Sequence, residues 1–216
     1  MKATARSYAP TVRLFLAVPI PPDVAAAAFA LLPPPVAALR RVRPELMHLT
    51  LAFLGDTPDP RLAEVIAGAE AAAAGQRAFE IVLDQAGRFP VSGVPRVVWL
   101  GVGAGRGPLQ ALADRVVTAL RERALRFAAR PFQPHLTLAR IPERTPLPEA
   151  RAIAAAVAGL RVRPLAVPVD RIVVVESVLF ARGPRYRERG EARLSGGVSR
   201  TAPERPWTRS WRRDRR

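Results

Sequence analysis

Both histidines of this chain lie in one ten-residue pattern that occurs twice, and this duplication constrains the fold more than any other feature. Residues 43–52 read R-P-E-L-M-H-L-T-L-A and residues 130–139 read R-P-F-Q-P-H-L-T-L-A, so seven of the ten positions are identical. The expected elements repeat with the pattern, because each half reads strand, helix, histidine strand, helix, strand. We interpret this order as an ancient duplication that produced two α+β lobes related by an approximate two-fold axis.

The expected elements follow from apolar periodicity and from the positions of proline and glycine. Strands are expected at residues 13–18, 46–54, 79–83, 96–102, 136–141, 172–180 and 186–194. Helices are expected at residues 22–33, 59–75, 109–127 and 148–160. The predicted fold class is α+β, with two pseudo-symmetric lobes around a central cleft that carries two His-x-Thr motifs. Each lobe is expected to be an antiparallel sheet with flanking helices.

The two ends of the chain differ from the middle. Residues 1–11 are expected to form a flexible leader, residues 12–194 a bilobal domain, and residues 195–216 a basic, disordered tail without periodicity. The apolar stretch near the N-terminus is interrupted by prolines and is too short to span a membrane. We therefore expect a cytoplasmic protein without an export signal or a membrane partner.

Composition narrows the classes of partner and of chemistry. The formal net charge is +16, and Lys2 is the only lysine. A surface with this charge attracts polyanions such as RNA and DNA, although GC-rich codon usage is an alternative explanation of the arginine content. The chain has no cysteine, which excludes disulfides, thiolate metal sites and a cysteine nucleophile.

The repeated motif suits proton transfer at phosphorus. Side chains alternate along a strand, so His48 and Thr50 are expected on one face, as are His135 and Thr137. If the lobes meet around a two-fold axis, all four face one cleft. One imidazole then takes a proton from water, the other protonates the departing oxygen, and the threonines donate to phosphate oxygens. The alternative is a pair of ordinary half-buried structural histidines, and the residues alone do not decide which imidazole is the acid.

We expect no metal or other cofactor at this site. Two histidines on different strands, without cysteines or a neighbouring carboxylate cluster, make a poor transition-metal site.

Other residues near the motif are candidates for substrate binding. Arg140 follows His135 by five residues, at the position that Phe53 takes in the first half. Strict alternation would point Arg140 away from the cleft, so a forked contact with phosphate requires a bulge or the end of the strand. Core packing, turn capping and simple solvation are the alternatives for these candidates. The further candidates are the aromatic residues Phe132, Trp99 and Tyr186 and the rim arginines Arg43 and Arg130.

Several segments together resemble one known superfamily. They are R-L-F-L-A at 13–17, H-L-T-L-A-F-L-G at 48–55, P-R-V-V-W at 95–99, F-Q-P-H-L-T-L-A-R at 132–140 and E-S-V-L-F at 176–180. They resemble the two-histidine phosphoesterases, and more narrowly the RNA 2′,3′-cyclic phosphodiesterases that are also called 2′-5′ RNA ligases. The resemblance implies metal-independent hydrolysis of a cyclic phosphate at an RNA end to a 2′-phosphate. It also implies that His48 is the proton donor and His135 the proton acceptor.

Several functions remain open at this point. The expected partner is RNA with a cyclic phosphate terminus, with tRNA fragments as one candidate source, and we expect a monomer. The alternatives are 2′-5′ ligation as the reverse reaction, a small-molecule cyclic phosphodiesterase, and a non-catalytic RNA- or nucleotide-binding module. The presence of both histidines and both threonines favours catalysis, and the positive charge favours long RNA. The charge-rich segment 185–194 departs from the apolar final strand that is usual in the family.

Overall fold

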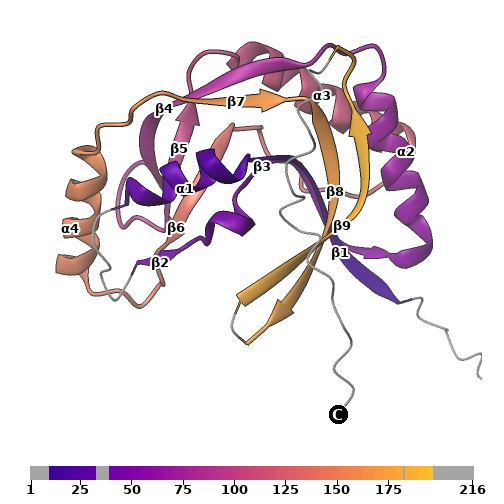
Figure 1. Ribbon diagram of the computed structural model, residues 1–216. Coiled ribbons are helices and arrows are strands. Elements are labelled where there is room, and N and C mark those ends of the chain that lie inside the picture. Colours follow the sequence, from indigo (N-terminus) through magenta and orange to yellow (C-terminus); the bar gives the residue numbers. More distant parts are fainter. Residues whose placement is uncertain (1–9, 33–38, 182, 197–216) are drawn as a thin grey trace, which may run out of the picture.

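A strongly curved antiparallel sheet forms the centre of the molecule (Figure 1). The computed structural model describes residues 10–32, 39–181 and 183–196. Eight of the nine strands in the described residues follow the order β7-β4-β5-β6-β3-β1-β8-β9, and the ninth, the short β2, pairs with β6. Their bounds are β1 Thr11–Pro19, β2 Arg40–Arg41, β3 His48–Pro58, β4 Phe79–Phe89, β5 Val97–Val102, β6 His135–Arg140, β7 Leu165–Val169, β8 Arg171–Phe180 and β9 Gly183–Arg193.

Four helices cover the sheet within the described residues. They are α1 Pro22–Ala30, α2 Leu62–Ala73, α3 Arg106–Glu122 and α4 Leu147–Ala158, with 3₁₀ turns η1 Pro44–Leu46 and η2 Asp59–Arg61. Helices α2 and α3 pack on each other, with α2 against β8 and β9 and α3 against β3, whereas α1 and α4 lie against β7 and β4. No helix in the described part of the chain has the length and apolar character needed to cross a membrane.

The α+β fold class is confirmed, and the two lobes meet at the histidine strands. Strands β3 and β6 pair at Leu49 and Leu136, and this is the junction within the sheet between the two lobes. One lobe contains β1, β3, β8 and β9, and the other contains β4 to β7. The lobes do not coincide with the sequence halves, because β4 from the first half and β8 and β9 from the second each join the opposite lobe.

The observed elements differ from the expected ones where the local pattern was weak. Strand β7 was not expected, because Pro168 interrupts its run; β7 lies at the edge of the sheet, where the missing proline N–H is tolerated. Strand β4 continues six residues past Leu83 to Phe89 through a polar, glycine-containing stretch. Helix α3 ends at Glu122, before the expected Phe127.

The expected leader and the expected tail fall mostly outside the described residues. Strand β1 begins at Thr11, within the expected leader, and residues 1–9 are not described. Ser195, at the start of the expected tail, bridges to Arg77 and donates its hydroxyl to the Gln76 carbonyl. Residues 197–216 are not described, so the proposed character of the tail stays a prediction.

Apolar side chains pack on both faces of the sheet. The main core lies between the sheet and the helices and takes alternate residues of β1, such as Leu14 and Leu16. The intervening residues of β1 point to the opposite face, which we call the histidine face. A second, smaller cluster lies there and consists of Phe15, Ala17, Val173 and Val175, with Phe53 and Tyr186 packed against it.

Candidate active site

The junction between β3 and β6 places both His-x-Thr motifs side by side. The antiparallel register pairs Leu49 with Leu136. One residue further in each direction, His48 lies opposite Thr137 and Thr50 lies opposite His135. Opposite residues of an antiparallel pair share a face, and diagonal neighbours such as the two histidines lie about 7–8 Å apart, with their Cβ atoms somewhat closer. The register therefore puts the four side chains on the histidine face, with Leu49 and Leu136 buried behind them.

Each imidazole is held by a hydrogen bond to the backbone carbonyl two residues earlier, just before its strand begins. His48 Nδ1 donates to the carbonyl of Leu46 at 2.8 Å, and His135 Nδ1 donates to the carbonyl of Gln133 at 2.7 Å. A carbonyl oxygen only accepts, so in both rings the proton resides on Nδ1 when the imidazole is neutral. Nε2 is therefore the nitrogen of each ring whose protonation changes. The two halves of the site are equivalent in this respect.

A β-bulge in each histidine strand re-aims the residue that follows. Leu138 is skipped in the pairing of β6 with β5, and Leu51 is skipped in the pairing of β3 with β1. Each bulge shifts the alternation by one position, so the fifth residue after each histidine returns to the histidine face. This residue is Phe53 in β3 and Arg140 in β6. The bulge that Arg140 needs in order to face the site is present.

Burial and Arg140 together determine the electrostatics of the site. The pKa of His48 is lowered from 6.5 to about 4, and burial is the largest cause. The Leu46 hydrogen bond opposes this shift, whereas the nearby charges of Arg140 and His135 contribute to it. The pKa of His135 is also lowered, first by burial and then by Arg140. Burial raises the pKa of the Tyr186 hydroxyl, against the opposing effect of Arg140 and Arg13. Arg140 thus acts on both histidines and on Tyr186.

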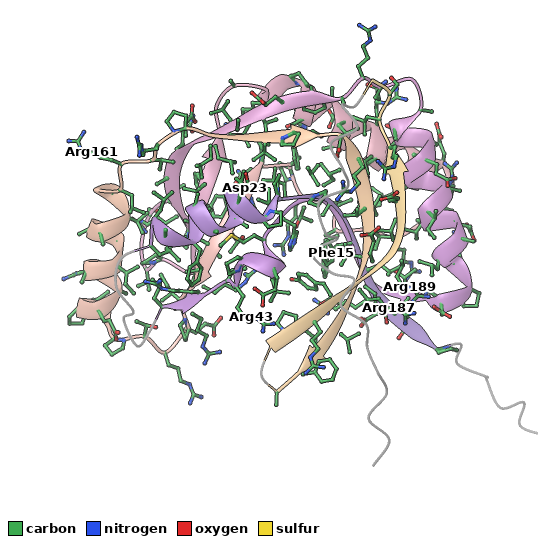
Figure 2. All side chains as sticks on the ribbon, in the orientation of Figure 1. Phe15, Asp23, Arg43, Arg161, Arg187 and Arg189 are labelled. Carbon is green, nitrogen blue, oxygen red and sulfur yellow. The ribbon has the colours of Figure 1, made fainter. Side chains whose placement is uncertain are left out.

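Aromatic rings enclose both histidines. His48 is stacked on Phe15 at 4.6 Å between ring centroids and meets the Tyr186 ring edge-on at 5.4 Å. His135 meets Phe89 edge-on at 5.1 Å and Trp99 at 6.4 Å. These rings displace water from the imidazoles, which explains why burial is the largest cause of both pKa shifts. Phe15, labelled in Figure 2, lies where β1 pairs with β8.

Trp99 depends on a glycine in the neighbouring strand. A Cβ atom added at Gly87 would come within 2.3 Å of the indole ring. Only glycine lets the ring lie against β4 and thereby beside His135. The predicted position of Trp99 at the site is thus built into the pairing of β4 with β5.

Three residues at the site were missed in the sequence. Phe15 and Arg13 belong to the histidine face of β1, where the Arg13 guanidinium lies 4.9 Å from the centre of the Phe53 ring. The alternation of side chains along a strand was the available signal, since Leu14 and Leu16 pack into the main core on the other face. Phe89 gave no such signal, because it follows the polar stretch into which β4 unexpectedly continues.

Three predicted candidates make no hydrogen bond or ring contact with either histidine in the described structure. Phe132 and Arg130 line a pocket of about 490 Å³ against α3, together with Phe127 and Arg121. Their loop folds back on α3 before β6 begins, which turns them towards that helix. Arg43 precedes η1 without a capping hydrogen bond from its side chain, and it pairs with Glu45 at 3.2 Å. Their participation in substrate binding stays a prediction.

The site residues do not assemble a metal-binding cluster. Over residues 10–32, 39–181 and 183–196, no three His, Asp or Glu side chains lie close enough together to hold an ion. The chemistry that these residues can perform themselves is proton transfer by two imidazoles and hydrogen bonding by the threonines and Arg140.

Similar proteins share this arrangement of elements. The RNA 2′,3′-cyclic phosphodiesterase of Thermus thermophilus is 32% identical over 204 residues, covering 91% of this chain and 98% of that protein. The enzyme of the same name from Aeropyrum pernix is 34% identical over 149 residues, covering 69% and 82%. A crystal structure of a Thermus thermophilus protein superposes with a TM-score of 0.68 at 30% identity, covering 84% of this chain and 97% of that one.

A structure with a bound nucleotide is also similar. Escherichia coli LigT complexed with 3′-AMP matches with a TM-score of 0.67 at 28% identity, covering 86% of this chain and 99% of LigT. The sequence model of the 2′-5′ RNA ligase superfamily matches residues 21–178, which include both histidine motifs. The resemblance carried by those motifs is thereby confirmed, and the chain belongs to the 2′-5′ RNA ligase superfamily.

Proposed function

We propose that this chain hydrolyses RNA 2′,3′-cyclic phosphodiester ends to 2′-phosphomonoesters without a metal ion. The observation that carries the proposal is the pair of matched imidazoles on adjoining strands, each with Nδ1 held by a backbone carbonyl. The names of the relatives from Thermus thermophilus and Aeropyrum pernix support the same reaction and substrate.

The proposed step is an in-line displacement at phosphorus. His135 Nε2 accepts a proton from the attacking water as the water oxygen bonds to phosphorus. The bond from phosphorus to the 3′-oxygen breaks, and protonated His48 Nε2 donates its proton to that oxygen. The product carries a 3′-hydroxyl and a 2′-phosphate, and one proton has moved from His48 to His135. Exchange with solvent then restores the starting state.

The remaining polar side chains of the histidine face bind the phosphate. The hydroxyls of Thr50 and Thr137 donate to its non-bridging oxygens, where negative charge accumulates in the transition state. Arg140 adds a forked, charge-assisted contact. Binding of the anion offsets the field of Arg140 at both imidazoles, which raises their pKa and allows the pair to hold the one proton that the step requires.

The chain's charge supports RNA as the substrate in preference to a small cyclic phosphate. A net charge of +16 favours a ligand with many phosphates. Ligation to a 2′-5′ bond would use the same groups, with the 5′-hydroxyl of a second RNA in place of water as the nucleophile that bonds to phosphorus while the bond to the 3′-oxygen breaks. A cytoplasmic monomer acting on RNA fragments, including those of tRNA, is the physiological setting that we propose.

The test is conversion of an oligoribonucleotide that ends in a 2′,3′-cyclic phosphate, with EDTA present. The expected product is the 2′-phosphomonoester, identified by its resistance to enzymes that act only on 3′-phosphates and by its mass. Conversion that requires an added metal ion, or formation of the 3′-phosphate, would overturn the proposal.

The pH dependence of kcat/KM follows from the lowered pKa of both histidines. The active form holds one proton on the pair, so activity is lost below the lower pKa and above the higher pKa. Since both values lie below 6.5 and that of His48 is about 4, both limbs of the bell are expected on the acid side of pH 6.5. The profile of kcat should lie at higher pH, because bound phosphate raises both values. A kcat/KM profile centred above neutral pH would contradict this.

A further inference from the structure

The hairpin of β8 and β9 extends beyond the rest of the sheet. Pairing of β1 with β8 ends at Leu14 and Glu176, so residues 177–180 are hydrogen-bonded to β9 but not to β1. In Figure 1 this end of the hairpin projects away from the body as a two-stranded ribbon. We call residues 177–180 and 183–187 the arm.

The arm carries three large apolar side chains that are exposed in the described structure. Leu179 is 66% exposed, Phe180 43% and Val178 38%. These are the exposed large apolar residues of β8, whereas the inner residues of the same strand are buried. Exposed apolar side chains gathered on one element usually mark an interaction site.

The arm is also cationic. Between Glu176 and Glu188 the sequence has no acidic residue. Arg185 and Arg187 are exposed, and the Arg185 guanidinium lies 4.8 Å from the centre of the Phe180 ring. Aromatic rings beside guanidinium groups are what proteins use to bind single-stranded nucleic acid, because bases stack on the rings and phosphates pair with the cations.

The arm is continuous with the active site. Ser177 pairs with Tyr186, whose ring lies 5.4 Å from His48, and the next pair on the same face is Leu179 with Pro184. Two residues of strand span about 7 Å, so the arm leads directly away from the histidines. Phe180, Arg185 and Arg187 lie on the opposite face of this two-stranded ribbon, so an RNA strand that passes over the edge of the ribbon contacts side chains of both faces.

We propose that the arm binds the single-stranded RNA that precedes the terminal cyclic phosphate, an inference that rests on the proposed function. Leu179 and Phe180 contact bases, and Arg185 and Arg187 contact phosphates. RNA fits this surface better than a second copy of the chain does. Two arms packed together would bring arginines beside arginines with no acidic residue of the arm between them, whereas RNA brings the opposite charge.

The test compares two substrates and two pairs of substitutions. For an oligonucleotide of about ten nucleotides, the L179A/F180A variant is expected to lose about tenfold in kcat/KM, since the bases lose the ring and the apolar side chain that they contact. For a nucleoside 2′,3′-cyclic monophosphate, which does not reach the arm, kcat/KM is expected to be unchanged. For the R185A/R187A variant, the logarithm of the oligonucleotide binding constant should fall less steeply with the logarithm of the salt concentration. The slope should be smaller by about 0.7 for each arginine removed.

The matched control is R161A/R163A, which removes two exposed arginines that lie outside the arm. Figure 2 shows Arg161 at the left edge of the molecule, away from β8 and β9. This control should change oligonucleotide kcat/KM less than either arm variant does. Equal losses on both substrates, or no loss on either, would overturn the arm proposal. So would a wild-type dimer that L179A/F180A converts to a monomer in sedimentation, which would identify the arm as an interface between copies.

A separate readout distinguishes failure of the arm from failure of the proposed function. Anisotropy of a labelled RNA that already ends in a 2′-phosphate reports binding without turnover. If the wild type converts neither substrate, the proposed function fails. The affinity of the same arm variants for this RNA still tests whether the arm binds RNA. Unchanged affinity in both variants would overturn the arm.

Discussion

Replacement of His48 or His135 by alanine is expected to lower kcat/KM for a cyclic-phosphate RNA end at least 10²-fold, because each general acid or base contributes about 10²–10⁴ to the rate. The two imidazoles act in one step, so the double variant should be little slower than either single one. The measurement is initial rate against substrate concentration at the pH optimum of each protein. Both variants should bind the 2′-phosphate RNA product, because Arg140 and the threonines remain.

The two histidines can be given separate roles with a modified substrate. In a cyclic phosphate whose 3′-oxygen is replaced by sulfur, the leaving thiolate needs no proton. The H48A variant should then recover most of its lost rate, whereas H135A should not, since attack by water still requires a base. Recovery by H135A alone would reverse the roles. A loss below tenfold in either single variant on the normal substrate would remove that histidine from the mechanism.

The core of the site was predictable because its signal is local. His48 and Thr50 sit two residues apart in a strand, and the same spacing recurs at His135 and Thr137. Side chains alternate along a strand whatever its partner strands are. Each half of the site can therefore be recognised from a three-residue segment of the sequence. What the sequence could not supply is the single pairing of Leu49 with Leu136 that puts the halves beside each other.

The surroundings of the site were less predictable because they depend on pairings distant in sequence. Phe89 reaches His135 only because β4 continues along β5. Phe15 and Tyr186 reach His48 because β1 lies between β3 and β8, and β8 carries β9. Strands are thus exchanged between the lobes. The two halves of the sequence therefore correspond to the repeat but not to the two lobes of the structure.

Arg140 is an exception to the alternation of side chains between the two faces of a strand. Counting from His135 places Arg140 on the buried face, and only the bulge at Leu138 returns it to the site. The same bulge at Leu51 turns Phe53 inward in the other half. A bulge cannot be recognised reliably in a single sequence. The two otherwise equivalent halves do differ five residues after the histidine, where one has arginine and the other has phenylalanine.

Replacement of Arg140 by alanine is expected to lower kcat/KM by about 10²–10³, the usual effect of removing one donor to a developing anion. It should also move both limbs of the kcat/KM profile to higher pH. The Arg140 charge lowers the pKa of His48 and of His135, so its removal lets both rise towards 6.5. A residue that only supported the fold would change the rate without this displacement.

The R140K variant separates the charge of Arg140 from its forked geometry. Lysine keeps the positive charge, so the limbs of the profile should stay near their wild-type positions. It loses the planar pair of donors, so the rate should fall, though less than in R140A. The R161A variant, which removes a distant exposed arginine, should alter neither. If R140A keeps the wild-type pH profile, Arg140 does not face the imidazoles, and the bulge at Leu138 has no part in building the site.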